Sequence, residues 1–425
     1  MLILLLALVA LIGLGLPVAY SLGLAALCFF VIEDPWLIQV LPQRVFSGLN
    51  SYTLISLPLF ILMGLVMNQA GITQRLVSFS AFFVGRLQGG LALVNVLASM
   101  LFGGISGSSS SDTASIGSIL IPEMERRGYP TRFASGITVA SSTMGMIIPP
   151  SIPMVLYAVV SQESVGRLFL AGLIPGVLIG VVQLGIALLI SKREGYPAED
   201  NELSFARFFT EVRRSTLVLI MPVFIVGSVV FGVATATESA ALGVFYAAVL
   251  GFFVLRLLTV VALVESLKTA VLISAKIMAI IAFSQAYMWV LALERIPEAI
   301  GGFVAGLGWA PIWTLLLVDV VILLAGTIID VSPAILLLTP VFLPAVAEAG
   351  VSPVQFGVVL ITGLAVGACT PPVGNCLNVC SAISGLGIGA IFRGAAPFLA
   401  ANVTIMLLVT ILPELSLWLP SLLME

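Results

Sequence analysis

Long apolar segments separated by short polar stretches run through the whole chain. They cover residues 1–16, 18–32, 54–70, 89–122, 133–160 and 168–190, and then 217–233, 239–255, 277–293, 312–345, 354–391 and 396–412. A helix needs about 20 consecutive apolar residues to cross a bilayer, so the chain has room for roughly ten to twelve membrane segments. The pattern predicts an all-α polytopic membrane protein.

Four stretches are more polar than this apolar background. Residues 34–51, 72–88 and 257–276 mix charged with apolar positions, which is typical of amphipathic segments at a membrane surface. Residues 192–214 form the only long polar stretch and carry five Lys or Arg residues. Because positive charge in short loops marks the cytoplasmic side, we interpret 192–214 as a cytoplasmic linker between two halves.

The two halves share a pattern of glycine and proline at one offset. A shift of 222 residues takes Pro122 to Pro344, Gly128 to Gly350, Gly145 to Gly367, Pro149 to Pro371 and Pro150 to Pro372. Five such matches at one offset are unexpected by chance, so the sequence predicts two repeats, residues 1–191 and 215–425.

The loops of the two repeats differ in charge. The first, around residues 126–132, carries Arg126, Arg127 and Arg132, whereas residues 345–355 carry no Lys or Arg and only Glu348. The repeats are therefore predicted to lie upside down relative to one another. An inverted repeat with a broken helix in each half is typical of secondary transporters.

Two elements in each repeat are predicted to be irregular at membrane depth. In 89–122 and 312–345, two apolar arms flank a polar tip, at 106–112 and 326–332. The arm from Leu91 to Ile105 would be about 22 Å long, too short for a core of about 30 Å. Both elements are therefore interpreted as re-entrant hairpins, the first entering from the cytoplasm and the second from outside. The segments 133–160 and 354–391 are predicted to be helices broken at 144–151 and 370–372.

Composition narrows the possible functions. The chain is 60% hydrophobic and 9% charged, with a mean hydropathy of +1.22, a net charge of −3 and no histidine. This excludes a soluble fold, a nucleic-acid role and His-based catalysis or metal binding. The four cysteines form no CxxC pair and are expected to be free core residues. The first 17 residues lack a basic start and a cleavage site, so we interpret them as a retained membrane helix.

The tips and breaks are the expected sites of chemistry, because irregular backbone at membrane depth is tolerated only in a cavity or a protein interior. Freed carbonyls and hydroxyls make an oxygen cage suited to Na⁺, and helix N-termini that point at the same centre suit a carboxylate. The candidate Na⁺ ligands are Ser106, Ser109, Asp112, Gly145, Pro149, Gly326, Asp330, Gly367 and Thr370. The candidate substrate ligands are Ser108, Ser110, Ser151 and Asn375. No cofactor and no transition metal are expected.

Single polar residues in membrane helices also have structural roles, through hydrogen bonds worth roughly 0.6–2 kcal/mol. For the serine run with Asp112 we favour function, since buried charge is costly and rare. For Glu238 we favour a cap at the start of the segment 239–255. Asp319 lies in an apolar run and could pair with Lys276 or Arg295, an alternative that stays open.

Several strings resemble one family of transporters. They are FGGISGSSSSDTASIGSILIPEMERRGYP (102–130), MGMIIPPSIPMVLYA (144–158), GTIIDVSPAILLLTPVFLPAVAEAGVSPVQFGVV (326–359) and TPPVG (370–374). These resemble the large membrane subunit of tripartite ATP-independent periplasmic (TRAP) transporters over essentially the whole chain. The resemblance implies an elevator-type importer of organic acids in the bacterial inner membrane, driven by Na⁺. It also implies two partners, a small four-helix membrane subunit and a periplasmic solute-binding protein.

Three other functions are compatible with parts of this sequence pattern. A stand-alone Na⁺/carboxylate symporter of a related inverted-hairpin family would share most of these features. Residues 104–107 match the GxSG of rhomboid proteases, but those enzymes need a histidine base and this chain has none. A channel can contain broken helices, yet two closed hairpins favour alternating access. We therefore expect a transporter and not an enzyme.

Overall fold

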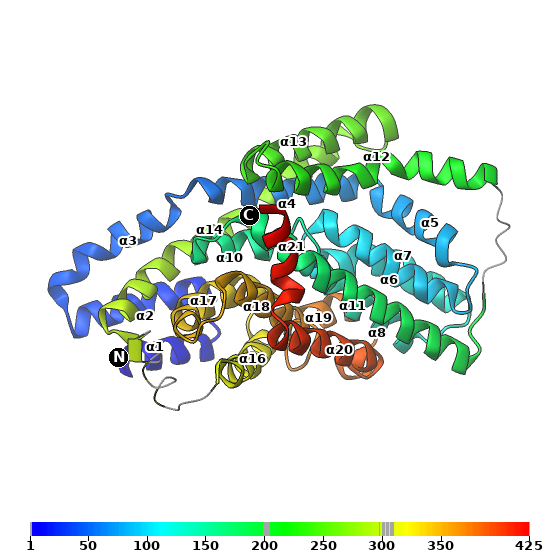
Figure 1. Ribbon diagram of the computed structural model, residues 1–425. Helices are drawn as coiled ribbons and strands as arrows, with labels where there is room; N and C mark the ends of the chain where they lie inside the picture. Colours follow the sequence, from blue (N-terminus) through cyan, green and yellow to red (C-terminus); the bar gives the residue numbers. More distant parts are fainter. Residues whose placement is uncertain are drawn as a thin grey trace.

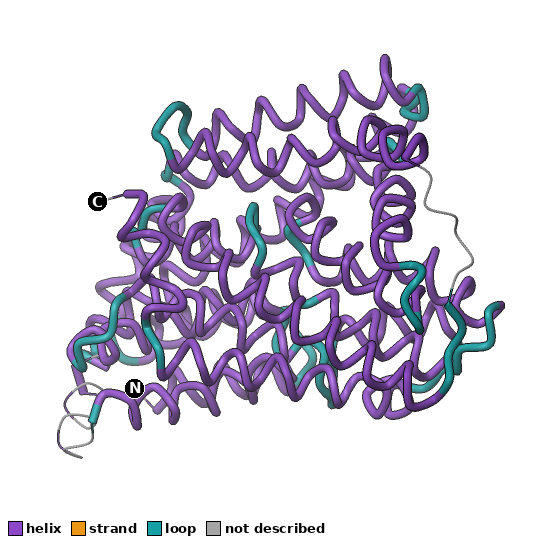
Figure 2. The backbone as a smooth tube through the Cα atoms, turned by 45° about the vertical axis from the view of Figure 1, so that its right-hand side comes forward, coloured by secondary structure: helices purple, strands orange, loops and turns teal. Residues whose placement is uncertain are grey.

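The protein is helical throughout the described residues. A computed structural model describes residues 2–198, 205–296, 298–299, 302, 306 and 310–424, and no strand occurs among them (Figures 1 and 2). Six of these helices are long and apolar enough to cross a membrane, or seven if the bent pair Thr131–Ile147 and Ile152–Ser161 counts as one span. The predicted all-α polytopic membrane fold is confirmed.

The first half contains eleven α-helices and two short 3₁₀ turns in the described part of the chain. In order they are α1 Leu2–Gly13, α2 Val18–Ile32, η1 Pro35–Gln39, α3 Val40–Leu49, η2 Tyr52–Ile55, α4 Ser56–Gln69, α5 Ile72–Val84, α6 Gly90–Ser106, α7 Ser109–Arg126, α8 Thr131–Ser142, α9 Met144–Ile147, α10 Ile152–Ser161 and α11 Val165–Glu194.

The second half follows a similar order. Its elements are α12 Phe205–Val230, α13 Ala236–Val249, the π-helix η3 Leu250–Leu255, α14 Val260–Leu293, α16 Pro311–Ile328, α17 Val331–Glu348, α18 Pro353–Gly367, α19 Asn375–Ser384, α20 Ile388–Ile411 and α21 Glu414–Met424.

Helix bounds recur at the offset of 222 residues. Helix α7 spans 109–126 and α17 spans 331–348, which coincide after the shift. The loops that follow them also match, because Gly128 has a φ of +85° and Gly350 a φ of +84°. A left-handed residue just after a helix satisfies its last carbonyls, and glycine adopts that conformation without strain. The same residue types thus end the same helix in both halves.

Three predicted boundaries are wrong. Segments 257–276 and 277–293 are one continuous helix, α14, which contains no glycine or proline to interrupt it. The second broken helix ends at Ser384, not at 391, because Gly385 closes α19 with a φ of +69° and α20 already begins at Ile388. The polar linker is shorter than 192–214, since α11 continues to Glu194 and α12 begins at Phe205. Between α14 and α16, residues 297, 300–301, 303–305 and 307–309 lie outside the described residues.

The start of the first hairpin, its end and the start of the linker lie at one end of the molecule. The Tyr129 hydroxyl donates to the Pro197 carbonyl at 3.2 Å, and the Gly89 amide donates to the same carbonyl at 3.2 Å. The rings of Tyr129 and Tyr196 lie 4.7 Å apart. The hairpin α6–α7 therefore enters and leaves at the same end, as the short arms predict.

The two broken helices run in opposite directions. From the start of α8 onward, the Cys380 thiol contacts the Ser135 carbonyl at 3.7 Å and the Cys369 thiol contacts the Val139 carbonyl at 3.3 Å. Farther along, the hydroxyl of Tyr157 in α10 donates to the Pro353 carbonyl at 2.6 Å. Residues that come later in α8–α10 contact residues that come earlier in α18–α19. The two broken helices are therefore antiparallel.

The helices form two packed groups. Helix α14 packs along α2, α3 and α4, and α13 packs on α4. The two hairpins pack with the broken helices and with α11 and α20. Figure 1 shows the first hairpin (cyan) to the right of the centre and the second (yellow to orange) at the lower left. The tips of both hairpins meet α4 and α14 where the groups adjoin.

Candidate functional site

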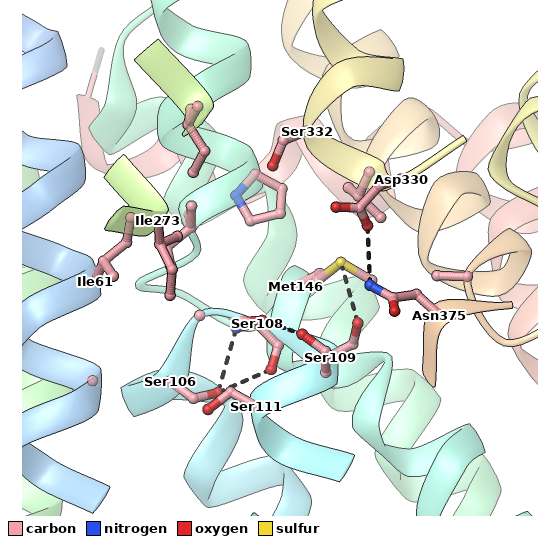
Figure 3. A pocket seen from close by; sticks show the side chains of 18 of the residues that line it. Ile61, Ser106, Ser108, Ser109, Ser111, Met146, Ile273, Asp330, Ser332 and Asn375 are labelled. Atoms are coloured by element: carbon pink, nitrogen blue, oxygen red, sulfur yellow. Dashed lines mark hydrogen bonds between the residues drawn. The ribbon is translucent and has the colours of Figure 1, made fainter. Parts of the chain in front are cut away.

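A pocket of about 680 Å³ lies where the two groups of helices meet. Both hairpin tips and both helix breaks line it, with α4 and α14 as the facing wall. Figure 3 shows Ile61 and Ile273 of that wall on one side, and Asp330 and Asn375 on the other. Four segments that are far apart in the sequence therefore converge on one cavity.

The first tip presents a cluster of serine hydroxyls. Gly107 closes α6 with a φ of +60°, and Ser108 is extended at the N-cap of α7. The hydroxyls of Ser108 and Ser110 lie 3.1 Å apart, and the Ser108 amide donates to the Ser106 hydroxyl at 3.4 Å. Ser109 also lines the cavity, and its hydroxyl accepts from the buried Cys376 thiol at 3.2 Å. Neutral donors and acceptors thus face the cavity beside the positive end of the helix dipole of α7.

Glycines allow each hairpin tip to pack closely against the helix break of the same half. A Cβ on Gly104 would lie 3.1 Å from the Pro149 carbonyl oxygen, and one on Gly145 would lie 3.2 Å from the Ser108 carbonyl oxygen. In the second half the contact is closer, because a Cβ on Gly367 would lie 2.6 Å from the Cα of Gly326. At these positions the backbone of the tip contacts the backbone of the break. Such a close approach requires glycine, because a side chain would keep the two segments apart.

Hydrogen bonds fix the same junctions. The Ile152 amide donates to the Gly107 carbonyl at 3.3 Å, which links break and tip in the first half. The Val373 amide donates to the Thr327 carbonyl at 3.1 Å in the second half. Both Pro–Pro bonds, 149–150 and 371–372, are cis.

Asp112 lies behind the first tip and outside the pocket. Its side chain is fully buried, and neither carboxylate oxygen has a hydrogen-bond partner among the described residues. The Thr113 hydroxyl beside it is also unpaired there. A Cβ on Gly145 would lie 3.6 Å from the Cβ of Asp112, so the carboxylate is next to the first break. A buried carboxylate without partners costs several kcal/mol, and a bound cation would remove this cost.

The second tip carries an accessible carboxylate. Asp330 is exposed to the cavity and accepts a hydrogen bond of 3.4 Å from the Asn375 amide, across from the second break (Figure 3). Ser332 and Pro333 of α17 line the same side. The Thr370 hydroxyl is engaged in its own helix end, where it donates to the Val366 carbonyl at 2.8 Å. Asp330 and Asn375 therefore offer oxygens to a second cation or to the substrate.

The structure brings only part of the predicted set to the cavity surface. The residues that line the pocket are Ser106, Ser108, Ser109, Ser110, Asp330 and Asn375. Gly145, Pro149, Gly326, Gly367, Thr370 and Asp112 lie at the junctions behind it. Ser151 is buried at the N-cap of α10, where its hydroxyl accepts from the Met154 amide at 3.3 Å and donates to the Met146 carbonyl. These two hydrogen bonds give Ser151 the role of a helix cap.

Two pocket residues were missed from the sequence. Lys276 was placed in an interfacial arm, yet it lines the cavity from α14, and Asn68 lines it from α4. The signal for Lys276 was available, because a lysine near the middle of a long apolar helix marks a polar surface. Because the predicted boundary falls at residue 276, the sequence pattern places Lys276 at the end of a segment and not in the middle of a long helix.

The remaining polar candidates have structural partners. Thr235 and Glu238 form a capping box at the start of α13, which confirms the cap. Asp319 pairs with neither Lys276 nor Arg295, since one oxygen accepts from the Thr410 hydroxyl at 2.9 Å and the other is unpaired among the described residues. All four cysteines are free, as expected.

Comparisons with known proteins place the chain among membrane permeases. Residues 5–415 match the family described as "Tripartite ATP-independent periplasmic transporter, DctM component". The chain is 37% identical to the C4-dicarboxylate TRAP transporter large permease protein DctM of Pseudomonas aeruginosa, over 94% of each chain. It is 36% identical to the sialic acid TRAP transporter large permease protein SiaM of Vibrio cholerae, over 96% of this chain and 95% of that one. The solved structure of the YdaH transporter of Alcanivorax borkumensis is similar in fold, with a TM-score of 0.68 at 14% identity, over 96% of this chain and 98% of that chain.

Proposed function

Because this chain belongs to the DctM family of tripartite ATP-independent periplasmic transporters, we propose that it couples the import of an organic acid to Na⁺. The family is one of multi-pass permeases, so the expectation of a transporter and not an enzyme is confirmed. One observation carries the coupling. A fully buried carboxylate without a partner, Asp112, lies directly behind a hairpin tip that lines the cavity.

Na⁺ suits the chemistry around Asp112. The Ser108 carbonyl lies beside Gly145 as Asp112 does, and the Ser106 hydroxyl donates to this carbonyl at 3.3 Å. Hard cations prefer such oxygen ligands. A second Na⁺ would take its oxygens from Asp330 and the backbone at Gly326, Gly367 and Thr370. No described residues form a His, Cys, Asp or Glu group able to hold a transition metal.

An organic acid suits the cavity. Carboxylate oxygens would accept from the hydroxyls of Ser108 and Ser110 and from the free amides at the N-terminus of α7. Asn375 offers a side-chain amide from the opposite tip. The named relatives act on a C4-dicarboxylate and on sialic acid, both of which carry carboxylates.

An elevator movement of two inverted repeats, 1–191 and 215–425, is the proposed mechanism. The antiparallel broken helices and the shared helix bounds support the inversion. The group that holds both hairpins would slide along the group that holds α2, α3, α4 and α14, and would carry the cargo with it. The polar linker predicted at 192–214 would lie in the cytoplasm of a bacterium, with the chain in its inner membrane.

Two partners complete the proposal, a small four-helix membrane subunit and a periplasmic solute-binding protein. The test is uptake into proteoliposomes that contain this chain with its small subunit. We expect radiolabelled succinate or N-acetylneuraminate to accumulate only with an inward Na⁺ gradient and the loaded binding protein outside.

Each alternative gives a different result in this assay. Uptake with Na⁺ but without the binding protein would identify a stand-alone symporter. Accumulation that is indifferent to replacing Na⁺ by choline would rule out Na⁺ coupling, and passive equilibration without accumulation would indicate a channel.

A further inference from the structure

Lys276 lies at the middle of the longest described helix. Helix α14 runs without interruption from Val260 to Leu293, so Lys276 is sixteen residues from one end and seventeen from the other. At 1.5 Å per residue, that is about 25 Å from either end. A lysine at such depth is tolerated only where its ammonium faces water or a partner. Lys276 meets this condition because it lines the cavity and is exposed there.

The ammonium of Lys276 forms no ion pair within the described part of the chain. It is the only cation among the residues that line the cavity, and Asp330 is the only carboxylate. No ion pair within 4.0 Å and no hydrogen bond joins Lys276 to any residue in the described ranges. One elementary positive charge is thus held open to the pocket, and an anion within it would be its natural partner.

The facing wall completes a site for an anion. On the side of the first tip, the start of α7 presents the hydroxyls of Ser108 and Ser110 to the cavity. Figure 3 shows Ser108 below Ile273 of α14. A carboxylate between the two walls would receive hydroxyl hydrogen bonds on one side and a charge-assisted bond from the ammonium on the other. The other residues of α14 that line the cavity, Ile273, Ile277 and Ile280, are apolar, so Lys276 is the side-chain donor that α14 offers there.

We propose that Lys276 binds the carboxylate of the transported acid from the α14 wall. The assignment rests on the proposed function, since it requires an anionic cargo in this cavity. It adds a specificity-determining residue, because a charged contact discriminates a carboxylate from a neutral analogue of the same shape.

Binding to the purified complex of this chain with its small subunit tests the proposal. Thermal-shift titrations would use succinate and N-acetylneuraminate, with succinamide as the neutral analogue of succinate. Lys276→Met keeps the length of the side chain and removes its charge, and Lys276→Arg keeps the charge. Lys268→Met is the matched control, because Lys268 is exposed on the same helix and does not line the cavity.

We expect Lys276→Met to weaken carboxylate binding about 10- to 100-fold, the loss typical of one hydrogen bond to a charged group. Its preference for succinate over succinamide should shrink by the same factor, which a merely structural role would not produce. Lys276→Arg should bind within about threefold of wild type, and Lys268→Met should match wild type, by the same reasoning on charge. The Na⁺ dependence of all three variants should be unchanged.

The outcomes separate this assignment from the function on which it rests. Equal carboxylate binding by wild type and Lys276→Met would overturn the role of Lys276 alone. Equal weakening by Lys268→Met would also overturn it, because the effect would then not depend on the cavity. Failure of the wild-type complex to bind or import either acid would overturn the proposed function and, with it, this assignment.

Discussion

Asp112→Asn is expected to abolish Na⁺-driven uptake, with a fall of about 100-fold or more in the initial rate. The carboxylate is fully buried and both of its oxygens lack partners among the described residues. An ionised carboxylate at this buried position requires a cation beside it, and Na⁺ would supply that positive charge. Asparagine keeps the shape of the side chain but removes the charge, so it removes the reason for Na⁺ to bind.

Thermal unfolding in detergent separates loss of the ion site from loss of the fold. The wild-type midpoint should rise with Na⁺ concentration at constant ionic strength, because a ligand of the folded state stabilises it. The Asp112→Asn midpoint should rise less with Na⁺ than the wild-type midpoint does, because only the proposed second site at Asp330 remains, and it should be no lower than the wild-type value in choline. Asp319→Asn is the matched control, since Asp319 is a second buried carboxylate that does not line the pocket and accepts from Thr410. A normal Na⁺ response in Asp112→Asn would remove Asp112 from the ion site.

The fold was largely predictable because glycine and proline mark its boundaries. The hairpins and the first broken helix end where Gly128, Gly350 and the Pro–Pro pairs require them to end. The predicted boundary at residue 276 is wrong because glycine and proline are absent there. Helix α14 therefore continues through the predicted surface arm 257–276 and the predicted span 277–293. The charged residues of 257–276 are what suggests an arm that is separate from 277–293. The charge of Lys276, however, faces the cavity and not the membrane surface.

The site was predictable as a set of segments but not as a set of side-chain directions. The sequence predicts residues 106–112 as one irregular tip, in which no face can be assigned. The structure begins α7 at Ser109, and from that point each residue is turned by about 100° from the last. Ser110, Ser111 and Ala114 consequently line the cavity, whereas Asp112 and Ile116 face the buried interior. The position of one helix start decides which residues line the cavity and which lie behind it.

The two repeats should respond differently to the same glycine substitution at equivalent positions. A Cβ on Gly367 would lie 2.6 Å from both the Cα and the carbonyl carbon of Gly326 and 3.0 Å from the Thr327 amide nitrogen. All three are backbone atoms of the second hairpin, so α16 would have to move away from the break. Overpacking of this kind costs roughly 1–3 kcal/mol or more. Gly367→Ala should therefore lower the unfolding midpoint and reduce uptake more than about 10-fold, because the second tip and its break separate.

Gly145→Ala is the informative partner of that variant, because Gly145 and Gly367 are related by the shift of 222 residues. Its Cβ would meet the Ser108 carbonyl oxygen at 3.2 Å, a tight contact that a shift of a few tenths of an ångström relieves. Uptake should stay within a few-fold of wild type. Gly185→Ala in α11 controls for the substitution itself, since nothing lies within 4 Å of its Cβ position and alanine favours a helix interior. Equal tolerance of alanine at 145 and 367 would mean that the second tip does not rest on its break, and the second ion site would lose its backbone ligands.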